Sequence, residues 1–386
     1  MLAWFLFAGA WAFVFYVLFG YPLLLLWMAR RETRPVTRHF EPRSVTLLMA
    51  VHNGERWIRG KLESILALDY PRDLLQVIVI SDGSDDATAD IVREFAGSGV
   101  ELLRVPRGGK ALALNAGMAR ARGEILFFTD VRQPLEEDCL RRLVACFADP
   151  AVGVVSGELC ITLGGGTAEE VNTGLYWRYE KEIRKRLSRI DSILGATGCI
   201  YAMRRELASP LPAGTLLDDM CLPLMAFFRG YRVVMEESAR AYDKPTGLED
   251  EFRRKVRTLA GVYQVIAMFP ELLLPWRNRM WIHFVSHKLA RLLLPFAFAV
   301  IAAASFELSH PFAAISLAAQ AVFCAIAAAD RWIPESAPGK RWASMARTFV
   351  SMMAAALCAV SIAFRPSASF WKPPAGAAAE GVRSVR

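Results

Sequence analysis

The sequence predicts a mixed α/β domain with a mostly parallel sheet, joined to α-helices that span a membrane. Three observations predict this architecture. Short apolar runs alternate with amphipathic stretches between about residues 44 and 245, which is the pattern of a doubly wound sheet. Residues 1–29 carry no charge, and further long apolar stretches follow residue 280. The chain is 54% hydrophobic over 386 residues, which is too apolar for an ordinary soluble enzyme.

The first predicted element is a membrane helix over residues 1–29. Its apolar run is too long for a secretory signal, and it has neither a basic leading region nor a small-residue cleavage site. Arginines follow it at once, at positions 30, 31, 34, 38 and 43. Because positively charged flanks stay on the cytoplasmic side, we expect the N-terminus outside and the domain of residues 44–245 in the cytoplasm.

Apolar runs that end in polar residues mark the predicted strands of this domain. They begin near residues 44, 74, 100 and 124, and the stretches 54–68, 89–99 and 108–123 between them have helical spacing. In such sheets, ligands bind beyond the carboxyl ends of the strands. The polar residues there are Asn53, Asp82, Asp86, Lys110 and Asp130. Carboxylates gathered with a lysine suit a metal and a diphosphate.

The later elements are predicted to lie at or in the membrane. The basic, aromatic stretch at about 172–190 and the segment 246–280 are typical of interfacial helices. About three membrane helices follow within residues 281–365, at about 284–306, 312–329 and 346–364. If each of these helices crosses the membrane, the C-terminus lies outside. The basic residues after 364 argue against this and fit a last helix that only lies in the membrane interface. Residues 366–386 are expected to be a flexible tail.

Ionisable residues near the start of the first C-terminal span are a separate feature. His287, Lys288 and Arg291 are candidates to line a path at membrane depth. The alternative is that the long basic side chains only reach back to the interface. The net charge of +8 favours contact with anionic lipids or anionic substrates, and no nucleic-acid-binding motif is present. Seven cysteines without metal-ligand spacing indicate inert thiols in a reducing compartment.

The order of the motifs resembles that of the membrane-bound family-2 glycosyltransferases, the inverting GT-A enzymes related to cellulose, chitin and hyaluronan synthases. The motifs are AVHNGE, SDGSDDAT, GGKALALNAG, FFTDV, GATGCIYAMRR, LLDDM, RGYRVV and RRKVRT, over about residues 44–260. The resemblance implies a Rossmann-like GT-A domain, a UDP-sugar donor, a polysaccharide or lipid acceptor, and Mg²⁺ or Mn²⁺. It also implies a multi-pass enzyme of the bacterial inner membrane.

The resemblance assigns the donor nucleotide to residues that follow the first strands. Asp82 would accept hydrogen bonds from the uracil or ribose. Asp86 either contributes to this site or only caps the next helix. His52 would stack on the base and Asn53 would line the pocket, unless both merely end a strand. Lys110, between glycines that allow close backbone approach, would pair with the nucleotide as a point charge, or remain a solvated loop lysine.

The metal and the catalytic base are assigned in the same way. Asp130 matches the first acid of the D-x-D motif that holds the metal on the diphosphate, and Arg132 replaces the second acid. Arg132 would either meet a phosphate or make a structural ion pair. Asp218 and Asp219 fall on the family's T-E-D triplet, which makes Asp219 the expected general base. An acceptor hydroxyl needs such a base for a single inverting displacement.

The remaining motifs concern the acceptor. Thr197 and Gly198 would border the donor sugar and the acceptor, or form a tight turn. Aligned with the Q-x-x-R-W motif of processive synthases, the chain has Arg254 for Gln and Thr258 for Trp, while Arg257 is kept and would clamp the diphosphate. We expect exopolysaccharide synthesis. Transfer of one sugar to a lipid and a non-catalytic export subunit are the alternatives, and the sequence leaves open a homo-oligomer or an export partner.

Overall fold

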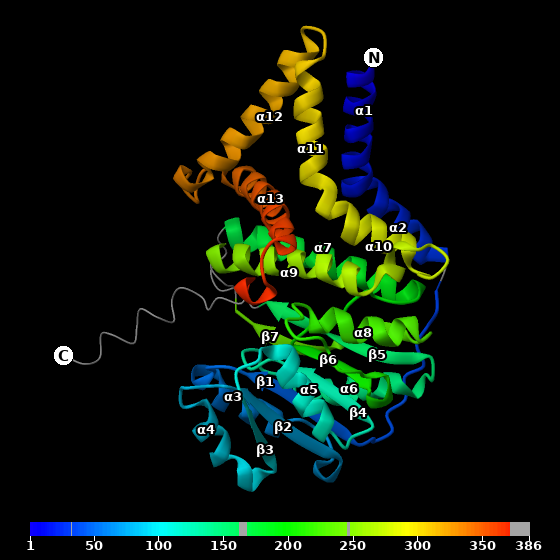
Figure 1. Ribbon diagram of the computed structural model, residues 1–386, viewed down its shortest axis with the longest axis vertical. Helices are drawn as coiled ribbons and strands as arrows, with labels where there is room; N and C mark the ends of the chain where they lie inside the picture. The colour runs from blue at the N-terminus through cyan, green and yellow to red at the C-terminus, as the bar shows by residue number, and fades with distance from the viewer. Residues whose placement is uncertain (32, 162–167, 245–247, 371–386) are drawn as a thin grey trace, which may run out of the picture.

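The computed structural model describes residues 1–31, 33–161, 168–244 and 248–370. Figure 1 shows the sheet domain at one end and the long apolar helices projecting from the other, with α7 and α9 between them. A short helical turn, Ser367–Phe370, ends the described part. Residues 371–386, which make up most of the predicted flexible tail, lie outside it.

A seven-stranded sheet forms the centre of the domain, in the order β3-β2-β1-β4-β6-β5-β7. Neighbouring strands are parallel except where β6 pairs with β4 and β5, which confirms the predicted mostly parallel sheet. The last three strands were not assigned from the sequence. The strands are β1 (Val45–Val51), β2 (Leu75–Asp82), β3 (Val100–Val105), β4 (Ile125–Thr129), β5 (Val152–Ile161), β6 (Ile200–Arg204) and β7 (Arg232–Asp243).

Helices cover both faces of this sheet, because alternate residues of a strand point to opposite faces. Leu48 of β1 joins a core with α5 and α8, whereas Leu47 and Met49 join a core with α3 and α6. Two buried faces explain why β1 and β2 are almost continuously apolar. These helices are α3 (Glu55–Leu66), α4 (Thr88–Glu94), α5 (Lys110–Arg120), α6 (Cys139–Ala145) and α8 (Asp218–Phe228).

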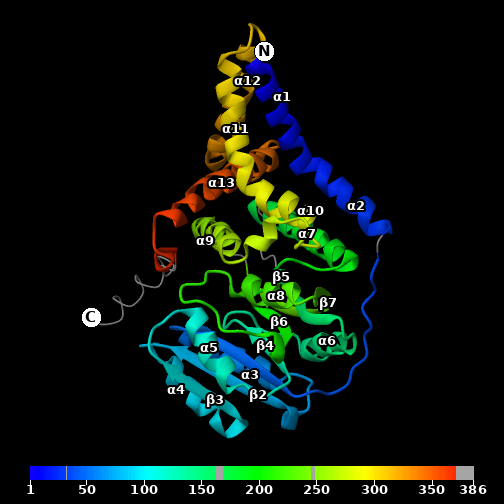
Figure 2. The same ribbon diagram turned by 45° about the vertical axis from the view of Figure 1, so that its right-hand side comes forward.

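Two long helices, α7 (Ala168–Ile190) and α9 (Leu248–Met268), lie between the sheet domain and the apolar helices (Figure 2). They occupy the two segments predicted to lie in the membrane interface. Both carry charged residues along much of their length and pack against the helices above them. The two helices therefore separate the sheet domain from the apolar helices, and their place in a membrane interface stays a prediction.

Four described helices are long and apolar enough to span a membrane: Leu2–Arg31, Trp281–Phe306, Phe312–Trp332 and Lys340–Ala363. Their α-helical parts are α1 (Leu2–Phe15), α2 (Tyr21–Arg31), α10 (Trp281–Phe284), α11 (Ala290–Phe306), α12 (Phe312–Ala329) and α13 (Lys340–Ala359), with π-turns at Tyr16–Gly20 and Val285–Leu289.

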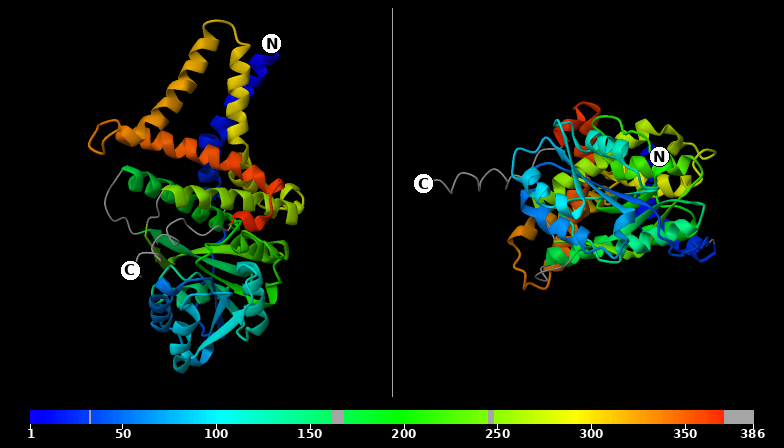
Figure 3. Two further views of the ribbon diagram at one scale, coloured as in Figure 1. Left: turned by 60° about the vertical axis from the view of Figure 1, so that its left-hand side comes forward. Right: turned by 90° about the horizontal axis from the view of Figure 1, so that it is seen from below.

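The last apolar helix differs from its predicted form. It begins at residue 340 rather than near 346. Figure 3 shows α13 lying across the foot of α11 and α12, where it contacts α9 and α7. Whether this helix spans the membrane or lies in its interface stays a prediction.

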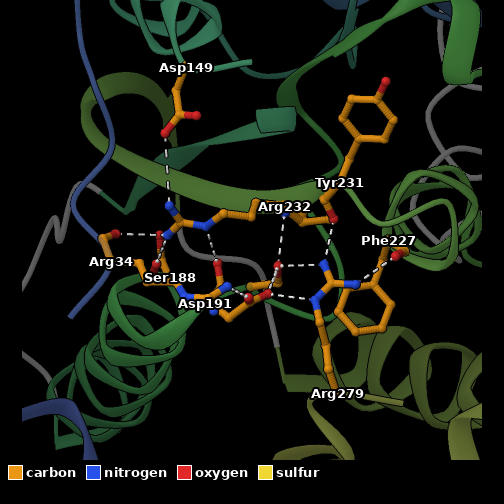
Figure 4. A network of polar contacts seen from close by, with 10 residues as sticks. Arg34, Asp149, Ser188, Asp191, Phe227, Tyr231, Arg232 and Arg279 are labelled. Carbon is orange, nitrogen blue, oxygen red and sulfur yellow. Dashed lines mark hydrogen bonds and ion pairs between the residues drawn. The ribbon is translucent and has the colours of Figure 1, made fainter. Parts of the chain in front are cut away.

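A polar network fastens the end of α7 and the loop before α10 to the sheet (Figure 4). Asp191, at the end of α7, accepts hydrogen bonds from Arg34 and Arg279, each at 2.9 Å. Arg232 of β7 donates to the backbone oxygens of Asp191, Ser188 and Arg34 at 2.9–3.0 Å. The segment after the first membrane helix, α7, β7 and the loop before α10 are thus held at one point.

Replacing Asp191 by alanine should lower the free energy of unfolding by about 2–3 kcal/mol, because charge-assisted hydrogen bonds from two guanidinium groups are lost together. Chemical denaturation of the full chain in detergent would measure this. Asp90→Ala is the control, since Asp90 makes only an exposed pair with Arg93 and should cost less than about 0.5 kcal/mol. Equal stability of the two variants would contradict a fastening role for Asp191.

Candidate active site

Three carboxylates and a lysine meet beyond the carboxyl end of β4. Asp130 follows that strand, Lys110 opens α5, and Asp218 and Asp219 form the first turn of α8. The Lys110 ammonium lies 2.9 Å from Asp130 Oδ1 and 3.2 Å from Asp218 Oδ2. Acids in a first turn are favoured by the partial positive charge of the helix N-terminus. The fold thus brings together residues from motifs about a hundred positions apart.

Lys110 is an organiser of this group rather than a solvated loop lysine. Burial alone would lower its pKa, but the charges of Asp130, Asp218 and Asp219 outweigh burial and raise the pKa. The lysine therefore stays charged and holds acids together that would otherwise repel one another. The sequence had assigned Lys110 to the nucleotide, and in the structure its partners are carboxylates.

Asp219 has the environment of a general base. Burial first, and then the neighbouring charge of Asp218, raise the pKa of Asp219 to about 6, while Lys110 opposes this shift. A base with a pKa near the working pH is the more effective one. A side chain at Gly198 would place its Cβ 2.9 Å from Asp219 Oδ2, so glycine is needed for this close approach. The backbone oxygen of Asp219 accepts a 2.7 Å hydrogen bond from Ala196.

Of the two roles considered for Arg132, contact with a phosphate or a structural ion pair, the structure shows the ion pair. Its Nη2 lies 2.5 Å from Asp243 Oδ2 at the end of β7, and Gln133 donates to the same oxygen at 2.8 Å. The loop after β4 is thereby tied to the far edge of the sheet. Asp130 is therefore the one acid that this chain keeps from the D-x-D motif, and it lies beside Lys110.

A buried lysine that the sequence reasoning missed supports the same loop from below. Lys61 of α3 donates to Thr129 Oγ1 at 2.7 Å and to the Gln133 carbonyl at 2.5 Å. Burial lowers its pKa to about 8. A signal was present, because Ile58, Lys61 and Ile65 fall on one helical face that is otherwise apolar.

Asp82 is buried at the end of β2 and its carboxylate is already engaged. It accepts from the backbone N–H groups of Gly108 at 2.7 Å and Gly109 at 3.0 Å, and from Arg107. The His52 ring nitrogen Nδ1 lies 3.0 Å from the Asp82 backbone oxygen. In this arrangement Asp82 fixes the glycine loop that leads into α5.

The other predicted nucleotide residues surround Asp82 at the ends of β1 and β2. Asn53 has a positive φ of 50° and donates to Asp85 Oδ1 at 2.5 Å. Asp86 accepts from the backbone N–H groups of Glu55 and Thr88, both at 3.0 Å. Burial opposes ionisation of Asp86, but these hydrogen bonds prevail and lower its pKa. Asp86 is thus bonded to the first residues of α3 and α4, and its role in a nucleotide site stays a prediction.

Thr197 is connected to α7 through Arg184, which sequence reasoning did not single out. Arg184 donates to Thr197 Oγ1 at 2.9 Å, to Ser156 Oγ at 3.0 Å and to the Gly195 carbonyl at 3.3 Å. Its charge also acts on Asp219. Arg184 is one of many basic residues on α7. Only the orientation in which that helix packs shows that Arg184, and not one of the others, faces Thr197.

The two arginines of the degenerate processive motif have different surroundings on α9. Arg254 pairs with Glu251 of the same helix. Burial lowers the pKa of Arg257, and the charges of Asp130, Asp219 and Asp218 oppose that shift. Arg257 thus lies within the electrostatic reach of the three site carboxylates, and its contact with a diphosphate stays a prediction.

The protein supplies only some of the ligands that a divalent metal would need at this site. Among the described residues, no group of three or more His, Cys, Asp or Glu side chains is placed to hold a metal ion. Asp130 has one oxygen on Lys110, and its side chain is 37% exposed. Mg²⁺ and Mn²⁺ are commonly held by one or two carboxylates, with the remaining oxygens from water and substrate phosphates. Asp130 suits that arrangement.

Comparison with known proteins finds similarity to one family of enzymes. Residues 46–211 match the family described as Glycosyl transferase family 2. The chain is 32% identical over 239 residues to the poly-β-1,6-N-acetyl-D-glucosamine synthase of Staphylococcus epidermidis. The aligned region covers 60% of this chain and 57% of that relative. It is 26% identical over 240 residues to the probable glycosyltransferase YdaM of Bacillus subtilis, with 58% and 56% covered. The chain thus spans little more than half the length of these relatives.

A solved structure matches nearly the whole chain. The mannosyltransferase PcManGT of Pyrobaculum calidifontis, in complex with GDP-Man and Mn²⁺, is 25% identical with a TM-score of 0.70. The match covers 93% of this chain and 99% of that one, so it includes the helices outside the sheet domain.

Proposed function

We propose that this chain, whose residues 46–211 form a family 2 glycosyl transferase domain, is an integral membrane, inverting glycosyltransferase that transfers a sugar from a UDP-sugar to a growing polysaccharide. The observation that carries this is the Asp130–Lys110–Asp218 bridge beside Asp219, below helices able to span a membrane. A relative that is a polysaccharide synthase supports the product class. The basic residues after the first helix support a cytoplasmic side for the sheet domain, as expected for an inner-membrane enzyme.

In this mechanism, the chain's own residues prepare one displacement. Asp219 takes the proton from the acceptor hydroxyl as the oxygen attacks the anomeric carbon, opposite the departing diphosphate. One such step inverts the anomeric centre. Arg257 stabilises the charge that develops on the leaving group. A divalent ion held by Asp130 would supply further positive charge to the diphosphate when bound.

Transfer of a single sugar to a lipid is the second candidate, and Thr258 favours it. Processive relatives implied by the sequence carry tryptophan here to stack on the acceptor sugar. Thr258 is instead exposed, and its hydroxyl donates to the Arg254 carbonyl of its own helix at 2.9 Å. It offers no stacking surface, so a growing sugar chain would need another platform.

Product analysis with and without metal tests this function. The full chain, reconstituted in lipid nanodiscs, would be incubated with radiolabelled UDP-N-acetylglucosamine or GDP-mannose, and with Mn²⁺ or EDTA. We expect labelled product with Mn²⁺ and a loss on the order of 100-fold with EDTA. High-molecular-weight product indicates polymer synthesis, and product extracted with lipid indicates the second candidate. Undiminished product in EDTA would contradict a requirement for a divalent metal. The absence of product with both donors would contradict the proposed glycosyltransferase activity.

A further inference from the structure

Cationic residues gather where the start of the first C-terminal membrane helix meets the candidate active site. We call them the cationic cluster, defined as Arg184, Lys255, Lys288 and Arg291. They come from α7, α9, the π-turn Val285–Leu289 and α11, which are neighbours in the fold (Figure 2). These cations share one nearby acid, Glu180, which lies in the electrostatic surroundings of each of them.

Glu180 cannot neutralise the whole cluster, because both of its oxygens are engaged. Oε2 lies 3.3 Å from His287 Nε2, and Oε1 pairs with Arg291. Arg184 is engaged in its hydrogen bonds to Thr197 and Ser156. Lys255 Nζ lies 3.7 Å from Glu251 Oε1 of its own helix. The acceptors around the cluster are thus taken up by Arg184, Lys255 and Arg291.

Lys288 is the member left without a protein partner in the described part of the chain. Its charged neighbours are Glu180, Arg184, Arg291 and Asp219, and none of the ion pairs found there includes it. An ammonium group beside two guanidinium groups, at the start of a membrane helix, is unfavourable unless an anion neutralises it. The surroundings of Lys288 thus favour an anionic ligand.

The π-turn that carries Lys288 is fixed by its other members. Ser286 bonds to the Tyr16 hydroxyl at 2.6 Å, and His287 stacks on Tyr21 at 6.1 Å, both in the N-terminal membrane helix. Such turns insert an extra residue into a helix and are common at functional sites. Here the turn is anchored on one side, and Lys288 remains on the side of α7 and Asp219.

We propose that the cationic cluster binds the phosphate group of a membrane lipid, with Lys288 as the main ligand. The position suits a phosphate, since the hydrocarbon chain would stay beside α11 while the head group lies near Asp219. The phosphate belongs either to a polyprenyl phosphate that is the acceptor, which rests on the lipid form of the proposed function, or to an anionic phospholipid of the bilayer.

Lipid binding by variants of the full chain tests this inference. The chain would be purified in neutral detergent without donor and titrated with fluorescent polyprenyl phosphate, phosphatidylglycerol or polyprenol. The variants are Lys288→Met, Lys288→Arg to restore the charge, and the control Lys185→Met. Lys185 lies on α7 but pairs with Glu237 of β7 at 2.8 Å, outside the cluster. Melting temperatures would establish that each variant is folded.

We expect Lys288→Met to weaken binding of the phosphate-bearing lipids about tenfold, Lys288→Arg to restore most of it, and Lys185→Met to change nothing. Polyprenol should bind weakly to every variant. Tighter binding of polyprenyl phosphate than of phosphatidylglycerol identifies the acceptor, and equal binding identifies a bilayer head group. Unchanged binding in folded Lys288→Met overturns the inference. Because no donor is present, that failure would leave nucleotide release, and hence the proposed function, unaffected.

Discussion

Replacing Asp219 by asparagine is expected to lower the turnover of sugar transfer about 10³-fold while changing the KM for the donor little. Asparagine has nearly the same shape, so the packing of Asp219 against Gly198 is kept. Its amide cannot take the proton from the acceptor hydroxyl, and the attacking oxygen remains protonated. Steady-state kinetics of the purified full chain would separate the effect on kcat from the effect on KM.

The matched control for this variant is Asp90→Asn, which removes an exposed acid on α4 that pairs with Arg93. It should leave both kinetic constants at their original values. Retention of most of the turnover by Asp219→Asn would show that the base is another residue.

Replacing Lys110 by methionine should move the acid limb of the pH–rate profile upward by about one to three pH units. The wild-type base is active when deprotonated, so its activity should fall as the pH drops through about 6. Lys110 lowers the pKa of Asp219 from the value that burial and Asp218 would impose. Without Lys110 the base stays protonated at higher pH, and alkaline conditions should recover part of the activity.

The profile of Lys110→Arg provides the comparison, because the charge beside Asp130 and Asp218 is kept there. Its acid limb should stay near that of the wild type. If Lys110→Met lowered activity equally at every pH, the lysine would act on the substrate rather than on the pKa of Asp219.

The sequence predicted the parts of the fold whose signals are local. Each of β1 to β4 is an apolar run that ends in a polar residue, and the helices between them have an apolar face. The antiparallel strand β6 lacks such a context. It lies within the motif GATGCIYAMRR, and its pairing with β4 depends on the rest of the sheet.

The predicted site residues that follow strands lie close together in the structure, as Asp130 and Lys110 do. The partners of those residues were harder to foresee, because they are set by tertiary packing. Arg132 pairs with Asp243, which is 111 positions away. Arg184 and Lys185 are adjacent and both basic, yet one meets Thr197 and the other Glu237. Only the docked orientation of α7 distinguishes them.

Release of nucleoside diphosphate by the purified full chain tests the central claim most directly. The chain and its Asp219→Asn variant would each be given a panel of UDP-sugars and GDP-mannose with Mn²⁺ in lipid nanodiscs. The account predicts that one donor is turned over by the wild type and that the variant loses this release almost completely. Release that is the same in both proteins, or absent with every donor, would contradict catalysis at Asp219.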